Sequence, residues 1–330
     1  MAGHLDVLWT SALDAAAGSA YDRFVDAAAG GHFAQARPWA KVAAAGRHFK
    51  VRYFLAREAD RVIGSALVLR PSVGPLVLPA AIVERGPVCA RREDLPRVLA
   101  AFARAARARG IARLTVMPYW AGAEAKEADE ALALAGFHDV QALDGAHATT
   151  LRIDLAKSDD ALCAGRERSN LRHSIKNAER AGAVARRATD ADMPIFERLY
   201  GEVMDPQRRT TKPRAWFAAL GELVREGSRA ALFVCDHENE AIGAAIVCRL
   251  GPMATLAFAA TTSAPRSISK LLLPLMAAIR WARAEGCATF DLGGVPPEDD
   301  PDTKRRDIAK FKLHFTKDRI SLVHEHARWF

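Results

Sequence analysis

The sequence lacks the apolar segments that mark membrane-spanning and exported proteins. Its longest nearly apolar run, Leu271 to Ile279, contains Pro274 and is far shorter than the roughly 20 residues needed to cross a bilayer. The first residues have neither a basic start nor an unbroken apolar stretch followed by a small-residue cleavage site. We therefore expect a cytoplasmic protein without a transmembrane helix.

Cysteine is scarce, and the usual metal and catalytic motifs are absent. The five cysteines are widely spaced and form no CxxC or His-flanked pair, so we expect reduced and mostly buried thiols rather than disulfides or a zinc site. The sequence contains no GxGxxG, GxxxxGK[ST], GxSxG or HExxH pattern. These absences argue against a Rossmann or Walker nucleotide site, a serine hydrolase and a zinc protease, and we expect neither metal nor cofactor. The cysteines are Cys89, Cys163, Cys235, Cys248 and Cys287.

What is present is an ordinary globular composition in a chain long enough for two domains. The 330 residues are 50% hydrophobic and 26% charged, and at roughly 150 residues a domain they predict two units, 1–150 and 151–330. In the first half the patterns predict helices at 11–29, 37–45, 92–109 and 124–135. Strands are predicted at 49–56, 62–69, 81–88, 111–116 and 137–140.

The second half repeats this order of elements. The patterns predict helices at 158–181, 189–203, 213–226 and 267–285, with strands at 149–155, 230–235, 241–249, 253–261, 287–292 and 320–326. Each half thus has helices, an antiparallel meander, a helix and a strand. The simplest fold is α+β, with two similar units of mixed, mainly antiparallel sheets flanked by helices. The last strand is a candidate for packing back on the first unit.

The net charge of +8 is concentrated in two segments, 166–187 and 303–319, which suggests an anionic partner. In the first segment basic residues recur at every fourth position of a predicted helix and form a ridge that suits phosphates. A solvated charged face without a ligand is an equally good reading. The residues of the ridge are Arg168, Arg172, Lys176 and Arg180.

A second candidate feature is the glycine pair Gly293 and Gly294 at the end of a predicted strand. Adjacent glycines permit positive φ and the close approach of a ligand to the backbone. Lys312 follows, flanked by Phe311, and can direct a cation into a cleft. The alternatives are an ordinary turn and a surface lysine.

Arg266 lies between a predicted strand and a long helix, where acyl-CoA-dependent transferases of the GNAT type place a Q/RxxGxG/A pyrophosphate loop. Arg266 fits the first position, but Ser269 and Leu271 replace the two small residues. The loop therefore argues against CoA without excluding an acyl carrier protein as donor.

Taken in order, several segments resemble the FemAB/FemX aminoacyltransferases, which append amino acids to peptidoglycan precursors. Together they span almost the whole chain. The matching pieces are Phe33-Ala34-Gln35 with Trp39-Ala40-Lys41, Arg85-Gly86-Pro87-Val88, Val116-Met117-Pro118-Tyr119, the helix Arg168 to Gly182, Phe258 to Thr261 with Arg266, and Phe290 to Gly294 through Phe311-Lys312.

The resemblance implies two GNAT-like (acyl-CoA N-acyltransferase fold) domains with a substrate cleft between or beside them. It assigns Lys312 to the aminoacyl end and to charge stabilisation, with backbone N–H groups near Gly293 and Gly294 as further candidates. The segment 227–250 lacks the helical hairpin of some FemA members, and Met117 stands where the family often has an acid, which excludes a general base there. The implied substrate-binding residues are Trp39, Lys41, Tyr119, Arg209, Lys212, Arg266 and Phe311.

The function expected from these residues is transfer of an aminoacyl group from aminoacyl-tRNA, as co-substrate, to an amine of a UDP-linked or lipid-linked cell-wall precursor. The basic ridge, Arg168 to Arg180, is then the nucleic-acid-binding part. One alternative keeps the fold but uses acyl-CoA or acyl carrier protein in exopolysaccharide or lipid metabolism. Another is a non-catalytic nucleic-acid-binding protein. The absence of aromatic residues from 166–187 argues against this alternative, because such proteins usually stack bases on aromatic side chains.

Overall fold

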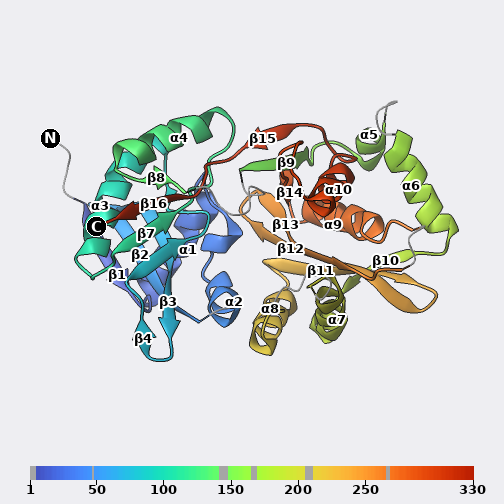
Figure 1. Ribbon diagram of the computed structural model, residues 1–330, viewed down its shortest axis with the longest axis horizontal. Helices are drawn as coiled ribbons and strands as arrows, with labels where there is room; N and C mark the ends of the chain where they lie inside the picture. Colours follow the sequence, from blue (N-terminus) through green and yellow to red (C-terminus); the bar gives the residue numbers. More distant parts are fainter. Residues whose placement is uncertain (1–4, 47, 141–147, 165–168, 205–210, 265–267) are drawn as a thin grey trace. The chain divides into compact units, whose positions relative to one another are not determined.

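The computed structural model describes residues 5–46, 48–140, 148–164, 169–204, 211–264 and 268–330 (Figure 1). The chain divides into two compact units. The first unit is Met1–Thr149 with Ile320–Phe330, and the second is Thr150–Arg319. The boundary lies one residue from the division expected from the sequence, and the last residues of the chain return to the first unit.

The first unit is a mixed sheet with strand order β1-β2-β3-β5-β7-β16-β8, to which β4 and β6 add by pairing with β3. Its helices are α1 (Ala15–Ala27), α2 (Trp39–Gly46), α3 (Leu95–Arg107) and α4 (Ala123–Leu134). Its strands are β1 (Asp6–Thr10), β2 (Phe49–Glu58), β3 (Arg61–Val73), β4 (Leu76–Val77), β5 (Ala80–Val83), β6 (Val88–Cys89), β7 (Arg113–Val116), β8 (His138–Asp139) and β16 (His326–Trp329).

Alternation along β2 places helices on both faces of this sheet. The ring of Tyr53 lies 5.5 Å from that of Tyr21 in α1, whereas the next residue, Phe54, lies 4.6 Å from Phe102 in α3. Successive side chains of a strand point to opposite faces. Helices α1 and α3 therefore cover opposite faces of the sheet.

The second unit is a sheet of order β10-β11-β12-β13-β14-β9-β15. Its helices are α5 (Asp159–Cys163), α6 (Ser169–Arg180), α7 (Met193–Met204), α8 (Arg214–Glu226), α9 (Leu272–Ala284) and α10 (Thr303–Lys312). Its strands are β9 (Thr149–Asp154), β10 (Val184–Ala188), β11 (Ala230–His237), β12 (Glu240–Leu250), β13 (Met253–Thr261), β14 (Thr289–Gly294) and β15 (Arg319–Ser321).

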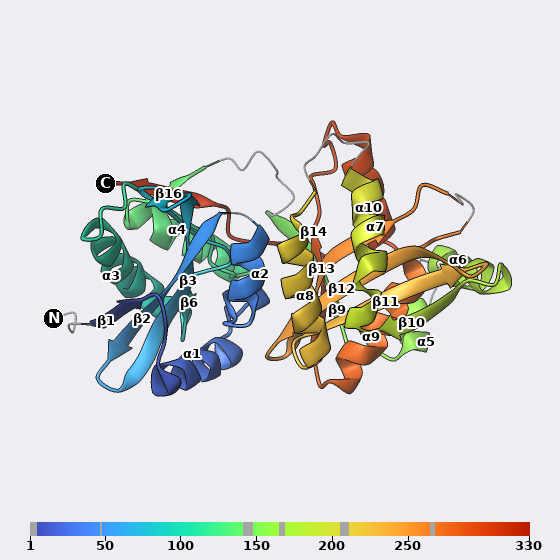
Figure 2. The same ribbon diagram turned by 90° about the horizontal axis from the view of Figure 1, so that it is seen from below.

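Helices again cover both faces. Helices α7 and α8 lie on one side of the sheet and α9 on the other (Figures 1 and 2). The core on the α9 side contains Phe233, Leu275 and Phe290, with Ala309 of α10 packed into it. All three are nearly inaccessible to solvent, so this core is the main apolar burial of the unit.

In each unit a helix joins two parallel strands that pair with each other: β5 and β7 through α3, and β13 and β14 through α9. In the first unit the parallel ladder covers the whole of β5, from Ala80 to Val83. In the second it ends at Thr255 and Asp291, although β13 continues to Thr261. The α+β class and the mixed, mainly antiparallel sheets are confirmed.

Several local predictions were wrong. The helix predicted over 158–181 is two helices, because Ala164 is extended and ends α5 at Cys163. The strand β10 and the helix α10, which begins at the capping side chain of Asp302, were not predicted. The final strand, predicted over 320–326, is β15 and then β16, so most of the predicted range lies between two strands.

Other predictions are confirmed. The predicted start of a helix at Ser158 is confirmed, because its side chain caps α5 by accepting a hydrogen bond from the Ala161 N–H at 3.2 Å. All five cysteines are free, and four of them are buried. Among the residues described, no helix is both long and apolar enough to cross a membrane.

Two glycines of the second unit give a matched test of the packing. A Cβ on Gly243 of β12 would lie 2.3 Å from the carbonyl oxygen of Lys270, whereas no neighbouring atom lies within 4 Å of a Cβ on Gly201 of α7. We expect Gly243→Ala to lower the free energy of unfolding by about 2 kcal/mol. Gly201→Ala should raise it by about 0.5 to 1 kcal/mol, since alanine favours the helix. Urea unfolding measures both, and equal values would contradict the packing described.

Candidate functional site

The site begins with Asp291, a buried carboxylate in β14. Its Oδ1 accepts hydrogen bonds from Thr150 Oγ1 at 2.5 Å and from the Gly293 N–H at 2.7 Å, and its Oδ2 accepts one from Arg152 Nε at 3.2 Å. The pairing of β14 with β9 shifts register between Asp291 and Gly294. The carboxylate therefore holds a bulge at the end of β14, directly after the parallel ladder with β13 ends.

Glycine is required at the centre of this bulge. Gly293 has φ +75°, as expected for the glycine pair. A Cβ there would lie 3.4 Å from the carbonyl oxygen of Leu256 and 3.7 Å from the Nζ of Lys312. Because the N–H of Gly293 is already donated to Asp291, this glycine is not an open donor for a substrate oxygen.

Lys312, in the last turn of α10, is held over the bulge. Its Nζ donates a hydrogen bond to the carbonyl oxygen of Gly294 at 2.8 Å. An ammonium group has three N–H donors, and among the described residues this is its one acceptor. The other two donors are therefore available to an oxygen placed beside Gly293.

The charge state of Lys312 follows from its surroundings. Burial lowers its pKa to about 8, and the negative charge of Asp291 acts in the opposite direction. With a pKa of about 8 the side chain is mainly ammonium at neutral pH. It can therefore stabilise negative charge that develops on an oxygen.

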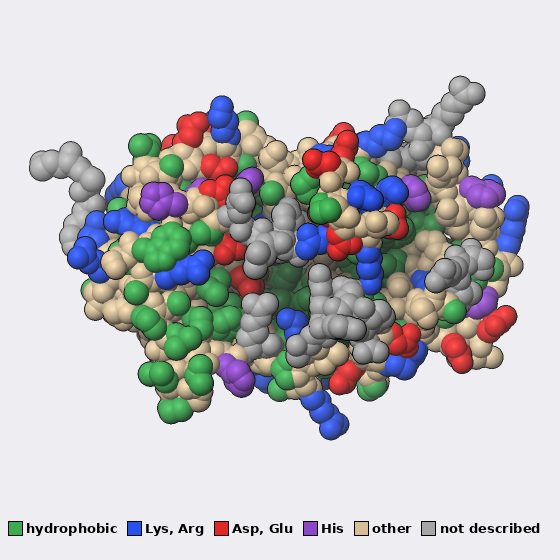
Figure 3. Space-filling model, viewed as in Figure 1, with side chains coloured by type: hydrophobic (Ala, Val, Ile, Leu, Met, Phe, Trp, Pro, Cys, Tyr) green, Lys and Arg blue, Asp and Glu red, His purple; other side chains and the backbone are tan. Residues whose placement is uncertain are grey.

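The neighbouring basic residues have different roles. Lys310 is exposed and pairs with Asp307 at 3.3 Å, and Arg305 lies 3.5 Å from Asp300. Arg319 lies 3.5 Å from Glu298. The surface around α10 accordingly carries acidic side chains beside basic ones (Figure 3). Part of the basic excess seen in 303–319 is thus balanced, by Asp307 within the segment and by Asp300 and Glu298 before it.

An aromatic contact connects Lys212 with the far end of β13. The Nζ of Lys212 lies 5.7 Å from the centre of the Trp216 ring, and Trp216 lies 4.9 Å from Phe258. The pairing of β12 with β13 shifts register between Leu256 and Phe258. Leu256 consequently packs on the α9 side, whereas Phe258 contacts α8. Trp216 was not among the predicted site residues, because a contact across 42 positions of the chain leaves no local signal.

In the first unit, Trp39 and Tyr119 belong to one aromatic cluster. Trp39 contacts Phe33 at 4.8 Å between ring centres, Phe33 contacts His32 at 4.4 Å, and His32 contacts Tyr119 at 4.5 Å. The guanidinium of Arg85 lies 5.2 Å from the Tyr119 ring. His32 and Arg85 were not among the predicted site residues, although Arg85 begins one of the motifs of the resemblance. Lys41 is exposed on α2.

Three of the four residues of the predicted basic ridge, Arg172, Lys176 and Arg180, lie on α6. Leu171 and Ala178 are buried, whereas Lys176 and Arg180 are exposed and form no ion pair with a described residue. Arg172 donates a hydrogen bond to the carbonyl oxygen of Cys163. We call Arg172, Lys176 and Arg180 the basic ridge below.

The remaining predicted residues divide into two groups. Phe311 is half-buried and lies 5.8 Å from Phe315 in the core beneath α10. Arg168, Arg209 and Arg266 lie outside the described residues.

The sequence and the fold were compared with those of known proteins. Residues 165–305 match the acetyltransferase (GNAT) domain family, and the comparison with curated proteins gave no match. FemX is similar in fold over 98% of this chain and 97% of its own, with 16% identity and a TM-score of 0.79.

Two further solved structures share the fold. A tandem GNAT protein from the clavulanic acid biosynthesis pathway has 14% identity and a TM-score of 0.60 over 99% of this chain and 98% of its own. The C-terminal domain of a putative lysylphosphatidylglycerol synthetase from Agrobacterium fabrum has 15% identity and a TM-score of 0.59 over 94% and 90%. The FemX-like tandem GNAT fold expected from the sequence is confirmed.

The lowered pKa of Lys312 predicts how the stability depends on pH. The folded protein loses this proton at about pH 8 and the unfolded chain near 10.5. The penalty for the buried ammonium is complete below pH 8 and disappears as pH rises toward 10.5. The free energy of unfolding of the wild type should therefore rise relative to Lys312→Met over this range, by at most about 1.4 kcal/mol per pH unit. Urea unfolding at pH 7.5 and 9.5 measures this, with Lys310→Met as control; parallel curves for wild type and Lys312→Met contradict it.

Proposed function

We propose that this chain is a FemX-like N-acyltransferase that transfers an aminoacyl group from aminoacyl-tRNA to an amine of a peptidoglycan or envelope precursor. The observation that carries the proposal is the position of the Lys312 ammonium. It donates one hydrogen bond to the carbonyl oxygen of Gly294 and has two further N–H donors, at the point where the pairing of β13 with β14 ends. The similarity in fold to FemX over nearly the full length of both chains supports it.

The chemistry explains why a fixed cation suits this position. An amine attacks the carbonyl of the aminoacyl ester, and the carbonyl oxygen becomes an oxyanion in the tetrahedral intermediate. The main requirements are orientation of the two reactants and a positive donor at that oxygen. Lys312 supplies the donor, and the bulge held by Asp291 fixes its position.

The acceptor side of the proposal rests on the other cations and the aromatic groups. Lys41 is an exposed cation on α2, which also carries the buried Trp39, and Lys212 is a half-exposed cation that precedes α8 and lies over the ring of the buried Trp216. We assign Lys41, with Trp39 and Tyr119, and Lys212 to the diphosphate-bearing precursor.

The donor side rests on the basic ridge. Its exposed cations Lys176 and Arg180 are one helical turn apart, and no acid of the described residues neutralises them. We assign the ridge to the phosphates of the tRNA.

A donor assay tests the reaction directly. Purified protein is incubated with labelled aminoacyl-tRNA or labelled acetyl-CoA, each with UDP-MurNAc-pentapeptide and an amine pool from a cell extract. Transfer from tRNA supports the proposal. Transfer from CoA alone, or from neither donor, contradicts it and moves the search to acyl carrier protein donors and envelope polysaccharides.

Replacement of Lys312 by alanine tests the catalytic role. Loss of an oxyanion donor typically reduces turnover by about 100-fold or more, and we expect this for Lys312→Ala in the active donor assay. Lys310→Ala is the matched control, because Lys310 lies on the same helix but is exposed and paired with Asp307. Wild-type turnover in Lys312→Ala removes this lysine from the mechanism.

Salt dependence tests the role of the ridge. Each phosphate contact contributes a slope of roughly 0.7 to 0.9 in a plot of log K against log salt concentration. Lys176→Ala combined with Arg180→Ala should therefore weaken tRNA binding and reduce the slope by about 1.4 to 1.8. Arg104→Ala, in α3 of the first unit, should leave the slope unchanged. An unchanged slope in the double variant would falsify phosphate binding by the ridge.

A further inference from the structure

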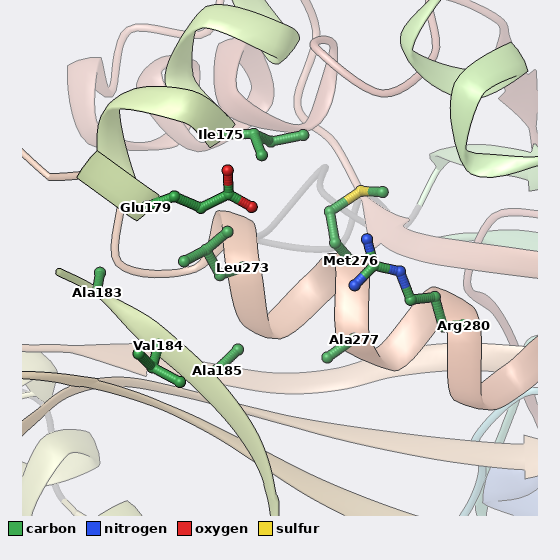
Figure 4. A pocket seen from close by; sticks show the side chains of 9 residues that line it. All are labelled: Ile175, Glu179, Ala183, Val184, Ala185, Leu273, Met276, Ala277 and Arg280. Carbon is green, nitrogen blue, oxygen red and sulfur yellow. The ribbon is translucent and has the colours of Figure 1, made fainter. Parts of the chain in front are cut away.

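A pocket of about 250 Å³ lies between α6, β10 and α9, all within the second unit. Seven of the nine residues that line it are apolar, and two charged side chains enter from opposite sides, Glu179 from α6 and Arg280 from α9 (Figure 4). No candidate site residue lines this pocket. The apolar side chains include Ile175, Leu273, Met276 and Ala277.

The pocket and the basic ridge share one helix. Ile175 and Glu179 line the pocket, and each directly precedes a ridge residue, Lys176 or Arg180. Positions one residue apart are rotated by about 100° around a helix axis. A ligand whose charge lies along the ridge is therefore within reach of the pocket on the adjoining side of α6.

The charges at the mouth restrict what the pocket can hold. Glu179 presents a carboxylate, which accepts hydrogen bonds and repels phosphate and fatty-acid groups. Arg280 presents donors and is anchored by a hydrogen bond from its Nε to the Asp159 carboxylate. A planar apolar group that carries both N–H donors and acceptors at its edge is complementary to this arrangement.

We propose that the pocket binds one unstacked nucleobase of an RNA whose phosphates follow the basic ridge. The proposal rests on the proposed function, because it takes the RNA to be the ligand of the ridge. A base inserts its ring between the apolar side chains, its exocyclic amine donates to Glu179, and its ring nitrogen or carbonyl oxygen accepts from Arg280. Unstacked bases of single-stranded RNA are recognised through their edges by hydrogen bonds and through their faces, including by the guanidinium plane of an arginine.

Replacement of Glu179 distinguishes two explanations of RNA binding, because attraction by charge alone and recognition of a base predict opposite changes in RNA affinity. Removing an acid beside a basic ridge strengthens the binding of any polyanion when only charge matters. If Glu179 accepts a hydrogen bond from a base, the same change weakens RNA binding. A base-reading contact of this kind is typically worth a factor of about 5 to 100 in affinity.

The experiment measures binding of the full chain to three ligands at two salt concentrations. They are bulk tRNA, polyphosphate, which carries the charge without the bases, and phosphatidylglycerol vesicles. The variants are Glu179→Ala and Ala277→Phe, which fills the pocket, and the control is Glu226→Ala at an exposed position of α8. We expect both pocket variants to bind tRNA about tenfold more weakly with an unchanged salt slope. Their affinity for polyphosphate should be equal to or higher than that of the wild type.

The outcomes separate this inference from the proposed function. One outcome is that tRNA binding depends on Lys176 and Arg180 but Glu179→Ala binds tRNA as tightly as the wild type or more tightly. The proposal of a nucleobase pocket is then wrong, and the assignment of the basic ridge to the tRNA phosphates is supported. If Ala277→Phe reduces binding to phosphatidylglycerol vesicles and not to tRNA, the pocket holds a lipid and the proposal is wrong. If the wild type does not bind tRNA, both proposals fail together.

Discussion

The buried carboxylate of Asp291 is the constraint on which the second unit's site depends. A buried charge is costly unless it is hydrogen-bonded and compensated, and Asp291 meets this condition through Thr150, Arg152 and the backbone of Gly293. The Gly293 N–H, two residues after Asp291, donates to this carboxylate, and the backbone forms a bulge there. The bulge directs the carbonyl of Gly294 toward Lys312. The hydrogen bonds that satisfy the Asp291 carboxylate on β14 thus also set the position of the Lys312 ammonium on α10.

The two units share a topology but differ at the end of their parallel strands, and the proposed reaction is assigned to the unit in which these strands separate. In the first unit the ladder of β5 with β7 runs to Val83 and Val116, and the Met117 N–H then donates to the carbonyl oxygen of Gly86 at 2.9 Å. In the second unit the ladder stops at Asp291, and a glycine and a lysine occupy the end. Backbone closure in the one unit and separation in the other explain why the cation that suits an oxyanion is found in the second.

The sequence predicted those features that depend on local patterns. Alternation gave the hairpin of β2 and β3, and the four-residue spacing of Arg172, Lys176 and Arg180 gave the ridge. It did not give the partners of Asp291, because Thr150 lies 141 positions away in the chain. It also did not distinguish Lys312 from Lys310 on physical grounds. Both are lysines in the last turn of α10, and only packing buries one and leaves the other paired with Asp307.

The choice of lysine at position 312 is itself consistent with a donor that must serve a transient oxygen. An arginine presents five N–H groups in a rigid fork, and burying it here would leave most of them without acceptors. A lysine needs one fixed acceptor, Gly294, to orient its ammonium while two donors remain for the reacting carbonyl. Its burial lowers the pKa to about 8, which leaves it charged at neutral pH at some cost in stability. An apolar side chain could fill the same space without this cost, so a charged lysine at this position fits the proposed role as an oxyanion donor.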